Sequence, residues 1–126
     1  MSSEPRTITL STVDHGDVTF TCPPWCTAAH ESGGYRIDIT HTSDDQTLTL
    51  PTRRAHAELL TLGLEVRPYV DRWPGTRPFV SIGFGGDYYP TRLAGLESMA
   101  IELERHAEVV REYARTLALL LAGGAQ

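Results

Sequence analysis

A seam of apolar residues over residues 93–121 constrains the fold more than any other feature of the sequence. Its members recur at alternating steps of three and four, which is the a/d pattern of an amphipathic helix sustained over four heptads. They are Leu93, Leu96, Ala100, Leu103, Ala107, Val110, Ala114, Leu117 and Leu121. The pattern predicts one long helix over residues 91–121. Gly95 weakens its first turn, and the two glycines at 123–124 end it.

The first half of the chain carries the alternating patterns of strands. Residues 6–14 and 17–21 flank a His-Gly-Asp turn and predict a hairpin that leads the chain to Cys22. Residues 35–41 alternate strictly between apolar and polar side chains and predict a third strand. After a Ser-Asp-Asp turn, residues 46–50 predict a fourth.

The segments between this region and the long helix are less regular. Within 51–63, Thr52 is placed to cap a short helix from Arg53 to Leu60 that Gly63 would end. Two further strands are expected at 64–73 and 77–85, each edge-like or beginning after its proline. Residues 85–90 are expected to form a loop. The pattern predicts an α+β fold in one domain, 1–126: a small, mainly antiparallel sheet with a zinc knuckle over 1–90, and the helix over 91–121.

Two cysteines and two histidines form the candidate site. Cys22, Cys26 and His30 are spaced C-x3-C-x3-H, and His41 follows eleven residues later. Zinc takes thiolate and imidazole ligands in a tetrahedron, with four protein ligands in structural sites. A helical turn over 25–30 would place Cys26 and His30 on one face. The glycines at 33–34 let the chain double back, so that the strand at 35–41 brings His41 to the same ion.

Other interpretations of these residues stay open. A redox dithiol is disfavoured because such pairs have two intervening residues and a βαβ context, and two inert buried thiols remain the simplest alternative. His41 lies on the apolar face of its predicted strand, where a hydrogen-bonded core histidine is also common. If His41 is not the fourth ligand, that position falls to His15 or to water. His56 and His106 are expected to be structural.

The stretch "CPPWCTAAH", followed by the histidine of "DITHTS", resembles the C-P-x-W-C-x3-H…H signature of a family of small uncharacterised actinobacterial domains. The resemblance rests on Cys22, Pro23, Trp25, Cys26, His30 and His41. It implies a zinc site followed by strands and a C-terminal helix, and it implies no activity. The longer segment between His41 and the final helix departs from the family's usual pattern, which leaves the role of residues 51–75 open.

Composition excludes some functions. The net charge is −5, and all 11 basic residues are arginines scattered along the chain, so nucleic-acid binding is disfavoured. No secretory signal is expected in residues 1–20, and the apolar "TLALLLAGG" is too short to span a bilayer. We expect a cytoplasmic protein, in which two close thiols favour a metal. The glycine-rich "GFGGDYYP" lacks the lysine of a phosphate-binding loop.

These observations favour a non-enzymatic, zinc-stabilised module for protein interaction or regulation. A zinc enzyme, which would keep an open coordination position, is the alternative, and a DNA-binding regulator is a third. A helix over 91–121 would span roughly 46 Å, whereas a compact domain of this size is only about 30–35 Å across. Part of the seam is therefore expected to pack against another copy, giving a homo-oligomer. Glu104 and Arg111 flank the seam and suit cross-chain ion pairs in an antiparallel arrangement.

Overall fold

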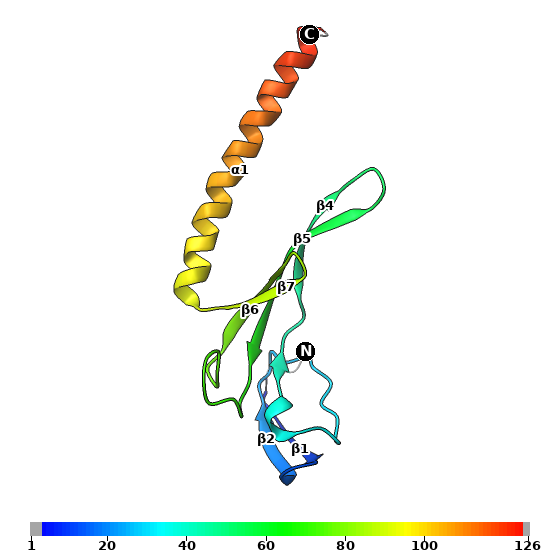
Figure 1. The fold of residues 1–126 in the computed structure, drawn as a ribbon, viewed down its shortest axis with the longest axis vertical. Helices are drawn as coiled ribbons and strands as arrows, with labels where there is room; N and C mark the ends of the chain where they lie inside the picture. The colour runs from blue at the N-terminus through cyan, green and yellow to red at the C-terminus, as the bar shows by residue number, and fades with distance from the viewer. Residues whose placement is uncertain (1–3, 125–126) are drawn as a thin grey trace. The chain divides into compact units, whose positions relative to one another are not determined.

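The computed structural model describes residues 4–124. Its backbone separates between Thr91 and Arg92 into two compact units, and each is described by itself. The first unit holds two antiparallel sheets, and the second holds a single long helix (Figure 1). The predicted α+β class is confirmed. That the whole chain makes one domain stays a prediction.

The first two strands form the predicted hairpin. β1 (Arg6–Thr12) pairs antiparallel with β2 (Gly16–Cys22), and the register runs from Thr12 opposite Gly16 to Arg6 opposite Cys22. Gly16 has a φ of 59°, a left-handed conformation that glycine adopts without steric cost at the turn. The hydroxyl of Thr12 donates to the Gly16 carbonyl at 2.8 Å. The hairpin therefore ends with Cys22 as the last residue of β2.

The larger sheet is built around one long strand. It contains β3 (His41–Thr42), β4 (Gln46–Pro51), β5 (His56–Val66), β6 (Phe79–Phe84) and β7 (Asp87–Thr91). β5 pairs with β3 near one end, with β4 along the rest of the same edge, and with β6 on its other edge; β7 then pairs with β6. All these pairings are antiparallel. The predicted strand at 46–50 is confirmed, and β6 begins directly after Pro78 as expected.

The prediction of a strand over 35–41 is wrong. This segment forms a short 3-10 helix, η1 (Arg36–Asp38), and strand pairing begins only at His41. The backbone N–H groups of Asp38 and Ile39 donate to carbonyls three residues earlier, and the N–H of Arg36 donates to the Asp14 carboxylate at 3.0 Å. Of the supposed apolar face, Tyr35 and Ile37 are exposed, while Ile39 and His41 are buried. In residues 35–39, hydrogen bonds between near neighbours in the sequence take the place of pairing with another strand.

The helix proposed for residues 53–60 is also wrong. Thr52 does not cap a helix but closes the β4–β5 hairpin, where its backbone N–H donates to the Ala55 carbonyl at 2.9 Å. Its hydroxyl accepts the Ala55 N–H at 3.0 Å. Residues from His56 onward belong to β5, whose backbone groups are taken up by strands on either edge. Tertiary pairing thus outweighs the local capping signal.

Two boundaries also differ from expectation. Residues 85–90 do not form a loop, because Gly85 and Gly86 make a two-residue turn and β7 begins at Asp87. Their φ angles of 62° and 86° suit the primed turns that match strand twist. The strand expected over 64–73 stops at Val66, and the N–H of Val70 donates to the Arg67 carbonyl at 3.2 Å in a turn.

A small apolar core lies between the hairpin and the segment that follows η1. Leu10 of β1, Phe20 of β2 and Ile39 are buried together, and Tyr69 packs against them with Ile8 and Val18 of the hairpin. The hairpin shares no ladder with the larger sheet in the described part of the chain. Its attachment therefore depends on this core and on the side chains beside it.

The second unit is the helix α1 (Leu93–Ala122), which confirms the predicted long helix. None of its described residues is buried. Two i,i+3 ion pairs lie along it, Glu102 with Arg105 and Glu108 with Arg111, each at 2.6 Å. No helix in residues 4–124 combines the length and apolarity needed to cross a membrane.

Candidate metal centre

The structure brings all four predicted ligand residues together. One ligand atom each from Cys22, Cys26, His30 and His41 lies within 4.8 Å of every other. His15, the reserve candidate, is outside this cluster, and its Nδ1 lies 2.9 Å from the Asp14 carboxylate instead. The cluster joins the end of the hairpin to the first strand of the larger sheet.

The two cysteines are placed by the end of β2 and by a tight turn. Cys22 is fully buried at the end of β2. The N–H of Cys26 donates to the Pro23 carbonyl at 3.0 Å, which closes a turn over Pro24 and Trp25 and brings the second thiol back to the first. Both cysteines are free, and both are buried.

The helical turn predicted over 25–30 is not formed. Residues 26–30 have no regular secondary structure. They run beside β3, where the N–H of Thr27 donates to the Thr42 carbonyl at 2.9 Å. The hydroxyl of Thr27 also donates to the Asp44 carboxylate at 2.8 Å. These bonds hold the segment that carries His30 next to the strand that carries His41.

The imidazole of His30 faces both sulfurs. Its Nε2 lies 3.5 Å from Sγ of Cys22 and 3.6 Å from Sγ of Cys26. Around a tetrahedral zinc with ordinary Zn–S and Zn–N bond lengths, a sulfur and a nitrogen ligand are about 3.6 Å apart. The three atoms therefore have the separations of a zinc coordination edge, with Nε2 as the ligand atom of His30.

His41 completes the cluster from β3. It is only 3% exposed, and its Nδ1 is buried with no hydrogen-bond partner among the described residues. Its ring centroid lies 5.1 Å from that of His30 and 5.4 Å from that of Phe20. Leaving a buried polar atom unsatisfied costs free energy. A metal ion bound by this nitrogen would remove that cost, so the donor set fits a metal.

Burial lowers the pKa of both histidines of the cluster and so favours the neutral form that binds metals. Desolvation lowers the pKa of His30, and the nearby Arg6 cation lowers it further. Desolvation also lowers the pKa of His41, with a smaller contribution from His30. Both rings are thereby held in the neutral form that binds metals.

The thiol of Cys22 is under opposing influences. Burial raises the pKa of Cys22, and the hydrogen bond with Cys26 raises it further. The Arg6 guanidinium acts against this, because it donates to Sγ of Cys22 at 3.2 Å and favours the thiolate. Sequence reasoning missed Arg6. The hairpin register contained the signal, since it places Arg6 directly opposite Cys22.

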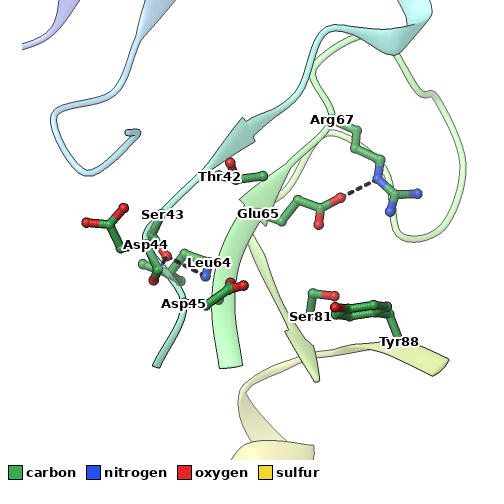
Figure 2. Close-up of a pocket in the computed structure, with 10 residues that line it drawn as sticks. Thr42, Ser43, Asp44, Asp45, Leu64, Glu65, Arg67, Ser81 and Tyr88 are labelled. Carbon is green, nitrogen blue, oxygen red and sulfur yellow. Dashed lines mark hydrogen bonds and ion pairs between the residues drawn. The ribbon is translucent and has the colours of Figure 1, made fainter. Parts of the chain in front are cut away.

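Two surface hollows lie near the cluster. The larger, about 590 Å³, starts at Thr42 beside His41 and is lined by Asp44, Asp45 and Glu65, whose carboxylate is paired with Arg67 (Figure 2). It contains no cysteine or histidine and so does not extend the metal ligands. The smaller, about 370 Å³, is lined in part by His30 and Glu31. The half-buried His30 thus borders this smaller hollow.

Comparison with known proteins gives one family and no characterised relative. No curated protein and no solved structure matches the chain. One family model matches residues 7–118, a span that includes the whole metal cluster and most of α1. The expectation of an uncharacterised domain family is confirmed. The chain belongs to the family described as "Domain of unknown function (DUF6907)".

Proposed function

We propose that this protein is a non-enzymatic module stabilised by one structural zinc ion and used in protein interaction or regulation. The observation that carries the proposal is the donor set: two thiols and two imidazoles, three of the four residues buried, with their ligand atoms within 4.8 Å of one another. Two sulfur and two nitrogen donors in a tetrahedron select zinc over harder cations. The actinobacterial signature that this sequence resembles implies the same four residues as zinc ligands.

The zinc ion would cross-link the hairpin to the five-stranded sheet. Cys22 belongs to the hairpin, whereas His41 belongs to the five-stranded sheet. An isolated two-stranded hairpin is at best marginally stable in water, and the core that holds it is small. Zinc bound by residues from both sides would supply folding free energy at this junction. Four protein ligands leave no position for a reactive water.

The partner side of the proposal rests on α1. The helix carries large apolar side chains that are exposed along the predicted seam, with Leu103 46%, Val110 58% and Leu117 55% exposed. We infer that this face binds a second copy of the chain. A cytoplasmic location is part of the same proposal, because a reducing compartment keeps the two ligand thiols free.

Metal analysis of purified protein tests the proposal. We expect one zinc per chain, and a chelator should lower the melting temperature sharply. X-ray absorption at the zinc edge should show two sulfur and two nitrogen neighbours and no water. Metal-free protein whose melting temperature is unchanged by the chelator would refute the zinc site.

One observation favours a zinc enzyme as the alternative. His30 and Glu31 line an open hollow of about 370 Å³ next to the ligand cluster. An enzyme would have three protein ligands and a water or hydroxide facing that hollow. The same absorption measurement separates the two functions, since a bound oxygen ligand supports catalysis. A DNA-binding regulator, the third candidate, is opposed by the net charge of −5.

A further inference from the structure

The seam of α1 alternates between small and large side chains along its central half. The small members occupy one heptad position and the large members the other. The small ones are Ala100, Ala107 and Ala114, and the large ones are Leu103, Val110 and Leu117. Each large side chain is about half exposed. Two copies of this face must fit these unequal side chains against each other.

Only one relative direction fills the space evenly. In a parallel helix pair each seam residue faces its own copy, so alanine–alanine layers would alternate with leucine–leucine layers. In an antiparallel pair each a position faces a d position. Every central layer then joins one alanine to one leucine or valine, which is the alternation that lets layers interdigitate without voids. We propose that α1 pairs antiparallel with α1 of a second copy.

The seam also sets the register. With Ala107 opposite Val110 of the second copy, Ala100 faces Leu117 and Ala114 faces Leu103. The same register sets Leu96 against Leu121. The register therefore pairs every large seam residue from Leu96 to Leu121 with a residue of the other copy, and leaves only Leu93 of the seam opposite a glycine, Gly124.

Charge complementarity supports the second copy as the occupant. In this register Glu104 lies beside Arg111 of the other copy, and symmetry repeats the pair. In a parallel pair Glu104 would lie beside Met99 and Arg111 beside His106, so the two charges would not meet. Within one helix they are seven residues apart, about 10 Å along the axis. Arg111 bonds Glu108 of its own helix at 2.6 Å and has further N–H donors available.

A charge-reversal cycle on the zinc-loaded full chain tests the antiparallel pairing. The dimer dissociation constant is measured by sedimentation equilibrium for wild type, Glu104→Arg, Arg111→Glu and the double variant. Each single reversal places like charges together twice, and we expect it to weaken the dimer about tenfold. The double variant should return to within about threefold of wild type. Glu112→Arg, on the opposite face, is the matched control and should leave the constant unchanged.

This inference rests on the self-association of α1 in the proposed function. The experiment can refute the antiparallel pairing without refuting the zinc site. A wild-type monomer at tens of micromolar overturns it. So does a dimer in which the double variant is weaker than either single variant, or a dimer insensitive to both single reversals. Zinc content and circular dichroism, measured on the same samples, report the metal site and the helix independently of the pairing.

Discussion

Replacement of His41 by leucine separates a metal ligand from a core histidine. His41 is 3% exposed, packs against Phe20 and His30, and has a buried Nδ1 without a hydrogen-bond partner among the described residues. Leucine has a similar volume and no polar atom, so His41→Leu removes the nitrogen while largely keeping the packing. The variant should therefore behave in opposite ways with and without zinc.

The expected loss of zinc affinity follows from the number of ligands. Structural zinc sites bind with roughly 10–16 kcal/mol at neutral pH. Shared among four donors, this gives about 3 kcal/mol for each. Removing one imidazole should thus weaken zinc binding roughly a hundredfold. The loss should appear in full because the other three donors of the described cluster would already bind the ion, leaving none to replace His41.

In metal-free protein, His41→Leu is expected to leave the stability unchanged or raise it. An unsatisfied buried polar group costs about 1–3 kcal/mol, and leucine removes that cost. Metal-free His41→Leu should then be as stable as metal-free wild type or more stable. If the histidine only filled the core, the substitution would instead change the stability by the same amount with and without zinc.

Competition with a chromophoric chelator measures the zinc affinity, and thermal unfolding with and without chelator measures the stability. His56→Leu and His15→Leu are matched controls, since neither residue lies in the cluster. A less than tenfold loss of affinity for His41→Leu would refute the reasoning and move the fourth position to water. Equal losses for His41 and His15 would refute it as well.

Three further substitutions follow from the site and its surroundings. Cys26→Ser removes a thiolate and should abolish stoichiometric zinc and strongly lower the melting temperature, as metal analysis and calorimetry would show. Arg6→Ala removes the donor to the Cys22 sulfur and should weaken zinc binding about tenfold in the same chelator competition, with Arg6→Lys intermediate. The N–H of Arg36 lowers the pKa of Asp14 below 3.8, so its stabilising effect is fully present above pH 3.8 and is lost as pH falls through the folded-state pKa. Asp14→Asn should therefore lower the melting temperature at neutral pH, and the difference from wild type should shrink as the pH falls below 3.8.

The ligand residues were predictable from sequence, although the local structure that joins them was not. The short spacing of Cys22, Cys26 and His30 lets them meet through more than one backbone path, so the prediction does not depend on a helical turn. The predicted helical turn and the predicted strand before His41 both fail. The four residues still meet because Thr27 and Thr42 share a backbone hydrogen bond, a pairing across fourteen intervening residues that no local pattern encodes.

The fold shows the same division between local and tertiary determinants. α1 was predictable because thirty residues repeat one period. β5 was mistaken in part for a helix because its apolar residues fall on both faces, and such a strand cannot be told from a buried helix by periodicity. The β6–β7 turn could have been predicted from the sequence, since Gly85 and Gly86 are typical of a tight hairpin. The path of residues 35–40 was not, because the Asp14 carboxylate that orders it comes from another turn.

The hairpin's lack of a ladder to the larger sheet makes it a separate unit of local unfolding. Its backbone groups bond to each other, the Val13 N–H donates to the Gly34 carbonyl, and the Ser11 carbonyl accepts from the Gly33 N–H, whereas β5 is bonded along both edges. Hydrogen exchange should accordingly divide the chain into an early-opening amino-terminal segment and a slowly opening sheet. Zinc would set the difference in opening free energy between these two units, so cellular zinc supply would control how long the hairpin of residues 6–22 stays folded rather than whether the whole chain does.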